Sequence, residues 1–486
     1  MLDVPSRAVD GRAADGRAVA ATSAIRLVFR KELRQMWRDA RLAVAVLASI
    51  LIVAAMALGG LRHHHSAQEE RAHASEVERK RWLGLGDFGP HGAAHHGVYA
   101  FRPDSPLASF DPGVAQYLGV SVWLEAHKQN AFVHRPMQDA APAKRFGDAT
   151  PALALQILGP LLIILLGFDA FAGERDSGTL RQLLAAGVSG RSLLLGKAAA
   201  VGGVALVLLS PALIVTGTAS LLAGEAADWT RFSLLAMAYL AYLATFLGMT
   251  LAVSAYARSA RAALAILLSI WVVDCFVLPR AGVEIADAAR PLPASAEWEA
   301  AMRADLSDGH AAASEQQVKR ELLAQYGVES EDALPVNWRA VMLQRGEEQN
   351  YLAFDTHFAR LADGMRAQDR IYQWGGLLAP SLALQSLSMG LAASDSEHHW
   401  RFVRAAEDHR RLIQKTVNSE LLLHPEKEWG EYKAGPELWA RVPEFHYLSP
   451  RFGEVAAIYL PAFLALAVWL TLSWTAALRA ARSARP

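Results

Sequence analysis

Residues 42–61 read LAVAVLASILIVAAMALGGL, twenty residues in a row without a charge. A helix of about 20 apolar residues is long enough to cross the hydrocarbon core of a bilayer, so this run predicts a membrane-spanning helix. The alternative is a secretory signal cleaved after Ala55-Met56-Ala57. The run exceeds the roughly 7–15 apolar residues of a signal, and a long segment precedes it, so we expect an uncleaved span.

Five more apolar runs follow, and they lie at about residues 152–168, 198–222, 232–256, 262–278 and 455–478. Asp274 is the only charged residue within them. Because lipid offers no hydrogen bonds to the backbone, every run should be helical. The sequence therefore predicts an all-α integral membrane protein with six transmembrane helices.

The composition excludes several other classes of protein. With 53% apolar residues, the chain is too hydrophobic to be mainly disordered. Its 48 basic and 48 acidic residues balance, which argues against a nucleic-acid-binding protein. Cys275 is the only cysteine, so the chain by itself forms no disulfide and no cysteine-based metal site.

Basic residues near the span ends predict the orientation of the chain. If the N-terminus is cytoplasmic, residues 1–41, 169–197, 257–261 and 479–486 face the cytoplasm and carry 18 Lys and Arg against 8 Asp and Glu. In this topology residues 1–21 form a disordered tail, residues 22–41 an amphipathic helix and residues 479–486 a second tail. Both ends of the chain are then cytoplasmic, and residues 62–151 and 279–454 form two extracytoplasmic insertions.

The two insertions differ in composition. Residues 62–151 contain clusters of Gly, Pro and His, which predict mostly irregular structure with short helices. Residues 279–454 are rich in helix formers, with long polar stretches around 297–326, 338–372 and 396–423. Six tryptophans give this second insertion enough apolar surface for a core of its own. We expect it to be a mainly helical domain.

The segment before the first span has the pattern of an interfacial helix. Ile25, Phe29, Leu33 and Met36 recur at helical spacing, and arginines occupy the other positions. Such a helix lies in the headgroup region of a membrane with its arginines on anionic lipid. Ordinary positive charges flanking a span are the alternative interpretation.

The loop between the second and third spans reads GERDSGTLRQLL over residues 173–184. Ser177-Gly178-Thr179 is suited to starting a short helix, and Leu180, Leu183 and Leu184 would form its apolar face. A short amphipathic helix of this kind can fill a groove on a partner protein. The alternative is a loop helix that packs on its own bundle.

Two resemblances to known families now become visible. Residues 174–184 (ERDSGTLRQLL), Ser189-x-Arg191 and Leu195-Gly196-Lys197 resemble the signature of ABC-2 type ABC transporter permeases, in which this stretch is the coupling helix. Residues 30–33 (RKEL) similarly resemble the elbow helix of such permeases, although many relatives carry a proline where Ala186-Gly187 stand. Residues 380–395 and 407–418 resemble the permease subfamily that has a domain of unknown function between its last two spans.

The resemblance implies a function, partners and a location. It implies a permease subunit of an exporter in the bacterial inner membrane, paired with a second copy or a paralogue, in contact with membrane lipids and bound to cytoplasmic ATPase subunits. A periplasmic partner for the second insertion is a further expectation, and no nucleic acid is implied. The chain is then not itself an enzyme: ATP and magnesium bind to the partner, because Gly190 and Gly196-Lys197-Ala198 lack the spacing and hydroxyl of a phosphate-binding loop. The residues expected to contact or support the ATPase are Glu174, Gly178, Thr179, Leu180, Leu183, Arg30 and Glu32.

Histidines crowd the first insertion and suggest a metal site by composition alone. The candidates are His63, His64, His65, His91, His95 and His96, with His73, His127 and His134 also in this segment. Closed ligand spacings such as His-Glu-x-x-His are absent from the sequence, so we favour a solvated polar loop and assign no metal.

Asp274 is a functional candidate because a carboxylate within a span is costly to bury. Exposure at the outer end of the helix, or pairing with Arg280, is the alternative. Other functions that remain open are a metal-responsive membrane sensor, an envelope component that transmits mechanical force, and a membrane-embedded enzyme, although no catalytic constellation supports the last.

Overall fold

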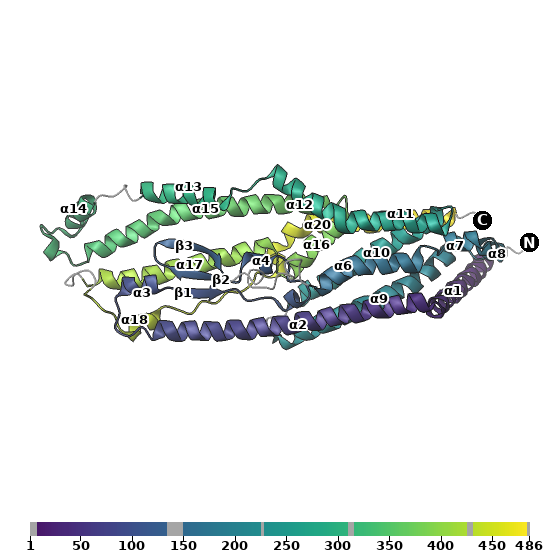
Figure 1. Cartoon of the computed structure of the whole chain (residues 1–486), viewed down its shortest axis with the longest axis horizontal. Coiled ribbons are helices and arrows are strands. Elements are labelled where there is room, and N and C mark those ends of the chain that lie inside the picture. The colour runs from purple at the N-terminus through teal and green to yellow at the C-terminus, as the bar shows by residue number, and fades with distance from the viewer. Residues whose placement is uncertain (1–6, 134–148, 225–227, 310–314, 425–430, 484–486) are drawn as a thin grey trace, which may run out of the picture.

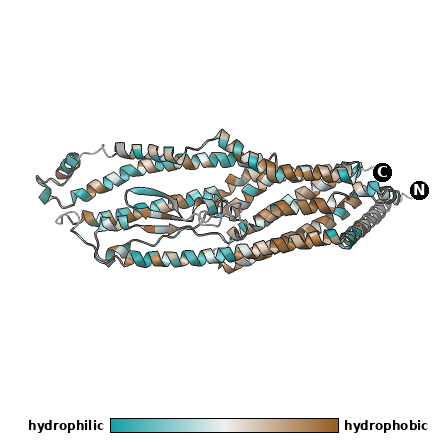
Figure 2. Cartoon of the chain, in the orientation of Figure 1, coloured by the Kyte–Doolittle hydropathy of each residue, from teal (hydrophilic) through white to brown (hydrophobic). Residues whose placement is uncertain are grey.

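The chain folds into an elongated molecule with an apolar half and a polar half, as the computed structural model in Figure 1 shows. The structure describes residues 7–133, 149–224, 228–309, 315–424 and 431–483, and of residues 7–21, 131–133 and 307–309 only the backbone. Figure 2 shows that hydrophobic residues concentrate at the end of the molecule where both chain termini lie. We call this end the apolar half and the opposite end the polar half.

In the described part of the chain, six helices are long and apolar enough to cross a membrane, as the sequence predicts. These spans are Ala40–Leu83, Pro151–Asp176, Gly190–Leu222, Trp229–Tyr256, Ala260–Ala289 and Phe452–Arg482. The most central are α6 (Pro151–Gly167) and α10 (Trp229–Tyr256), whose apolar stretches are more than half buried inside the chain. The fifth span contains α11 (Ala260–Val272), the π-helical turn η4 (Val273–Val277) and α12 (Leu278–Ala289).

The first span does not end where its apolar run ends. Helix α2 (Ala40–Leu83) continues beyond the apolar run, through residues 62–83, into the polar half. The side chain of Asp39 caps its start. Residues 62–83 are rich in Ala, Glu, Lys and Arg, which are strong helix formers, so nothing interrupts the helix at the end of the apolar run. One rigid element thus joins the two halves.

Three helices lie at the far end of the apolar half. They are α1 (Arg7–Arg38), α7 (Ala172–Asp176) and α8 (Thr179–Ala185). Figure 1 shows all three at this end, next to both chain ends; α7 is the last turn of the second span, and α1 packs along the start of the third span. The disordered tail expected over residues 1–21 falls partly outside the described residues, and from Arg7 onward the backbone is helical.

Residues 62–151, which we call the first polar segment, contain a small sheet that the sequence analysis missed. Strands β1 (Val98–Phe101), β2 (Ser121–Glu125) and β3 (Lys128–Val133) form an antiparallel sheet in the order β1-β2-β3. The short helix α3 (Pro90–His96) packs on β2, and the short helices η1 (Pro106–Ser109) and α4 (Ala115–Leu118) lie between β1 and β2 in the sequence. The expectation of mostly irregular structure gave too much weight to Gly and His and too little to the β-branched and aromatic residues of β1 and β2.

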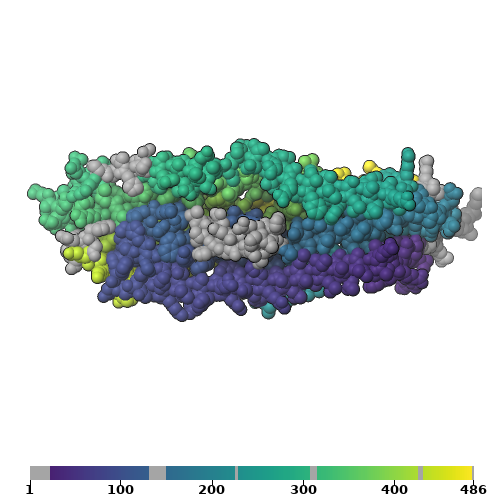
Figure 3. All heavy atoms as spheres, viewed as in Figure 1, coloured from purple at the N-terminus to yellow at the C-terminus, as the bar shows by residue number. Residues whose placement is uncertain are grey.

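Residues 279–454, which we call the second polar segment, are mainly helical, as expected. Its long helices are α13 (Ser295–Gly309), α14 (Glu315–Tyr326), α15 (Trp338–Gly375) and α17 (Ser396–Leu422), followed by the short α18 (Pro436–Arg441) and α19 (Phe452–Val455). In the space-filling view of Figure 3, part of the first polar segment lies between α2 and these helices. A shared core joins them, in which Trp82 of α2 meets Trp439 of α18 edge to face at 5.7 Å between ring centroids.

One helix of the second segment belongs to the apolar core. Helix α16 (Pro380–Leu391) packs Leu384, Leu387 and Leu391 against α10 and the last span helix α20 (Leu460–Arg482). The Ser388 hydroxyl contacts both Tyr239 of α10 and Asp111 of the first polar segment. The two halves therefore share packing and hydrogen bonds rather than only chain connections.

Candidate functional site

A buried lysine organises the end of the apolar half where α1, α7 and α8 lie. Lys197 is on α9 (Gly190–Leu222), and its side chain is 2% exposed. Its ammonium nitrogen lies 2.8 Å from Glu32 Oε1 on α1 and 3.0 Å from Glu174 Oε1 on α7. A buried ammonium is stable only when paired and hydrogen-bonded, and these carboxylates supply both conditions.

A second lysine completes the network. The Lys31 ammonium lies 2.5 Å from Glu174 Oε1 and 3.2 Å from Glu32 Oε1. Burial acts to raise the pKa of Glu32, but the Lys197 and Lys31 ammonium groups together outweigh burial, so the pKa of Glu32 is lowered. Burial likewise acts to lower the pKa of Lys31, but its hydrogen bond to Glu174 and the nearby carboxylates raise it. We call Lys31, Glu32, Glu174 and Lys197 the charge network; it has two positive and two negative groups.

A glycine allows α1 to approach α9 closely enough for these contacts. A Cβ atom on Gly196 would lie 2.6 Å from the Cβ of Val28, whose side chain is buried between the helices. Any larger residue at position 196 would push α1 away from α9. The position of Glu32 beside Lys197 therefore depends on the neighbouring glycine.

The loop that carries Glu174 is also fastened to the ends of α10 and α11. The Arg175 guanidinium donates to the carbonyl oxygens of Ala257 at 2.7 Å and Ala255 at 2.9 Å. The Asp176 carboxylate accepts from the Ala260 N–H at the start of α11 at 2.9 Å. Movement of α7 would therefore be transmitted directly to α1, α9, α10 and α11.

Helix α8 packs its leucines on the chain's own core, as in the second of the two interpretations of this loop. Leu180 is fully buried in the chain's own core, and Leu183 and Leu184 are half-buried against it. Gly178 precedes the helix in a left-handed conformation with φ +74°, and Thr179 begins it half-buried. The exposed residues of this turn and helix are Asp176, Ser177, Gly178, Arg181, Gln182 and Ala185.

The outer face of α1 carries the expected arginines, but the expected apolar stripe faces the bundle, where Met36 is buried and Ile25, Phe29 and Leu33 are half-buried. Leu27 is 66% exposed and Trp37 is 73% exposed, and Arg26, Arg30, Arg34 and Arg38 are exposed with them. Arg30 therefore lies outside the charge network, on the side of α1 that is open to lipid or a partner. The opposite side buries Val28 and Met36 against the bundle.

Asp274 occupies a different place from the two that the sequence suggested. It lies in the π-helical turn η4, is 4% exposed, and has its carboxylate 3.4 Å from the Ser381 N–H in the first turn of α16. A carboxylate at a helix N-terminus is stabilised by the helix dipole. In the described residues no ion pair joins Asp274 to Arg280, so its contact is to the second polar segment.

The candidate histidines separate into two groups. His63 and His65 are exposed on α2, His64 is buried there, and His96 is exposed at the end of α3. His91 and His95 instead lie together with His127, which the sequence analysis did not select. Lys197 was also missed as a functional residue, although a lysine at the start of an apolar span is an unusual signal.

Comparison with known families identifies the chain. Residues 26–307 match the family described as ABC-2 family transporter protein, and residues 295–448 match a domain of unknown function, DUF3526. No curated protein sequence matches the chain. Because the first match covers more than half of its length, this protein belongs to the ABC-2 transporter family: it is a multi-pass membrane protein of the permease class.

Proposed function

We propose that this chain is the permease subunit of an ABC exporter, and that residues 169–191 receive the movement of a separate cytoplasmic ATPase. The observation that carries this proposal is the charge network, which ties α7 to α1 and α9 at one end of the apolar half. A force applied at this end reaches four spans through short hydrogen bonds. The family membership supports an ATPase partner.

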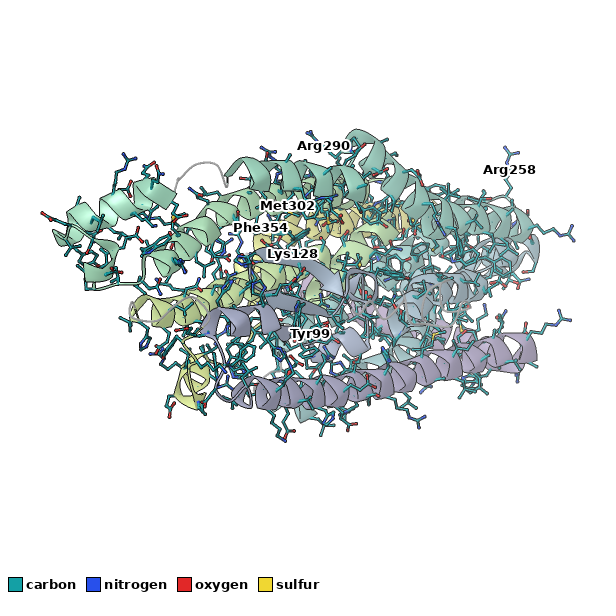
Figure 4. All side chains as sticks on the ribbon, turned by 60° about the vertical axis from the view of Figure 1, so that its left-hand side comes forward. Tyr99, Lys128, Arg258, Arg290, Met302 and Phe354 are labelled. Atoms are coloured by element: carbon teal, nitrogen blue, oxygen red, sulfur yellow. The ribbon has the colours of Figure 1, made fainter. Side chains whose placement is uncertain are left out.

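We further propose which residues touch the ATPase, on the basis of their exposure. Glu174, Leu180 and Glu32 are buried or half-buried and hold the loop in position, whereas Ser177, Gly178, Arg181 and Gln182 are exposed on it. Arg258, in the loop between α10 and α11, projects from the same end of the molecule, as Figure 4 shows. We propose that the exposed residues contact the ATPase and that the buried residues hold the loop in position. Thr179 and Leu183 are half-buried and could do either.

The lipid-facing surface supports a dimeric permease in the bacterial inner membrane. Only 11% of the apolar stretch of α2 is buried inside the chain, against 67% for the span that contains α6. The spans at α2 and at α11–α12 thus offer large apolar faces to lipid and to a second copy or paralogue. In this arrangement both chain ends are cytoplasmic and the polar half is periplasmic.

The test is the variant Arg181→Glu with Gln182→Glu, expressed in cells and purified in mild detergent. We expect the ATPase to copurify with the wild type and to be reduced at least tenfold with the variant. Arg360→Glu, an exposed charge reversal in the polar half, is the matched control and should retain the ATPase. Equal ATPase recovery from all three proteins would contradict the proposed contact surface, and no ATPase with the wild type would contradict the function.

A further inference from the structure

Three histidines from two elements of the first polar segment meet in the polar half. His91 and His95 are one turn apart on α3, and His127 is at the turn between β2 and β3. His91 Nε2 lies 3.1 Å from His95 Nε2 and 3.2 Å from His127 Nε2. All three rings lie within 5.0 Å of one another between centroids. We call these residues the histidine cluster.

The backbone holds the cluster in place. Residues four apart on a helix lie on the same face, which brings His91 and His95 together. The Ala126 N–H donates to the Ala94 carbonyl oxygen at 3.0 Å and fastens the β2–β3 turn to α3. His127 has φ +62°, an unfavourable conformation for a residue with a Cβ, and such strain is characteristic of functional positions.

Hydrogen bonding between the rings does not fully account for their arrangement. A neutral imidazole nitrogen carries either one hydrogen or one lone pair, so His91 Nε2 satisfies one of its two neighbours at a time. A single cation satisfies all three nitrogens together. In a tetrahedral zinc site with Zn–N distances of about 2.0–2.1 Å, ligand nitrogens lie about 3.3 Å apart, close to the two distances observed.

A buried carboxylate supports the third histidine. Glu347 of α15 is 1% exposed and contacts His127 Nδ1 through Oε1. Its Oε2 accepts from Gln414 Nε2 at 3.0 Å, and Gln414 in turn accepts from the Tyr351 hydroxyl at 2.6 Å. Glu347 therefore fixes the Nδ1 hydrogen of His127 and leaves Nε2 as a lone pair directed at the cluster. This carboxylate–histidine pair is the usual outer shell of a zinc ligand.

We propose that His91, His95 and His127 form a zinc-binding site that joins the two polar segments through Glu347. The three protein ligands leave a fourth position for water or another ligand. The site lies at the edge of a groove of about 550 Å³ that His127 and Glu347 help to line. Figure 4 shows the turn at Lys128 beside the part of α15 that carries Phe354, so the metal fixes this turn and α3 against α15.

Zinc binding to the full chain tests the site directly. The protein is purified in detergent with a tag that contains no histidine, stripped with chelator, and titrated with Zn²⁺ alone in equilibrium dialysis. We expect one Zn²⁺ per chain, at least tenfold weaker binding for His91→Ala with His95→Ala, and unchanged binding for His63→Ala with His65→Ala. The control removes the same number of histidines from α2, so a composition effect would weaken both variants equally and overturn the proposal.

Two further measurements extend the test, and the second needs no variant. Glu347→Gln should retain the site but weaken Zn²⁺ binding roughly 10- to 100-fold. On the wild type, mass spectrometry after diethyl pyrocarbonate treatment should show that Zn²⁺ protects His91, His95 and His127 but not His63 or His65. The absence of stoichiometric Zn²⁺, or equal labelling with and without it, would overturn the proposal.

Discussion

The charge network and the histidine cluster solve the same structural problem in opposite ways. Each joins three elements that are distant in the sequence by means of polar side chains. The charge network contains its own counter-charges, since Lys31 and Lys197 are balanced by Glu32 and Glu174. The histidine cluster has one supporting carboxylate, Glu347, and its three ring nitrogens are close enough together to hold one cation. The first should therefore be stable without additives, and the second should depend on a metal.

The largest expected effect is the loss of Lys197. Lys197→Met keeps the length of the side chain but leaves Glu32 and Glu174 buried with only Lys31 as partner. Removing one partner of a buried ion pair costs about 3–5 kcal/mol, so thermal unfolding in detergent should occur at clearly lower temperature.

Lys197→Met with Glu174→Gln tests whether charge balance is the cause. This double variant retains one positive group, Lys31, and one negative group, Glu32. It should therefore regain part of the lost thermal stability. A double variant less stable than Lys197→Met would contradict the balanced network.

Leu180→Ala tests whether α8 packs on its own bundle. Truncating a fully buried leucine costs about 2–5 kcal/mol, and thermal unfolding measures this loss. Arg181→Ala, the next and exposed residue, should leave stability unchanged. Equal stability of both variants would mean that Leu180 does not pack in the chain's own core.

Zinc should affect the stability of the polar half by a smaller and conditional amount. A ligand at 100 times its dissociation constant stabilises the folded state by about 2.7 kcal/mol. We expect Zn²⁺ to raise the unfolding temperature of the wild type but not that of His95→Ala, whereas the two proteins should unfold together in chelator. If Zn²⁺ still raised the unfolding temperature of His95→Ala, the stabilisation by zinc would not come from the histidine cluster.

The smallest effect belongs to the close approach of α1 and α9. Gly196→Ala places a Cβ against Val28 and should cost about 1–3 kcal/mol in thermal unfolding. Gly203→Ala, on the same helix with open space around it, is the matched control and should be neutral or slightly stabilising. A neutral Gly196→Ala would show that α1 adjusts without losing its contact.

The two regions also differ in what the sequence reveals of them. The six spans and the loop at 169–197 are predictable because apolar runs and a contiguous motif are local signals. The charge network is partly predictable, since all four of its residues lie in or beside the quoted motifs, but the pairing of Lys197 with Glu32 of α1 is a tertiary contact. The histidine cluster depends on pairing between residues 36 apart, and Glu347 comes from another segment altogether. Composition alone gave His91 and His95 no priority over His63 and His65.

The sheet was missed, and the surface that covers α8 was left open, for a related reason. Short strands such as β1 and β2 carry weak local signals, and their pairing is settled by α2, α3 and α17 around them. The periodicity of α8 predicts an apolar face but not which protein covers it. Such questions are decided by tertiary contacts that no window of sequence contains.

Helix α2 is continuous and can therefore act as a lever arm between the two halves of the molecule. Its 44 residues extend for about 66 Å, with one end in the apolar half and the other fastened in the polar half. There the Trp82 indole donates to the Trp439 carbonyl oxygen at 3.0 Å, and Glu78 accepts from the Tyr99 N–H of β1 at 3.2 Å. A tilt of about 5° in the span would displace the far end by several ångströms, given a helix of about 1.5 Å per residue. A rotation of this size within the membrane would therefore also move the sheet, because Glu78 of α2 is hydrogen-bonded to β1.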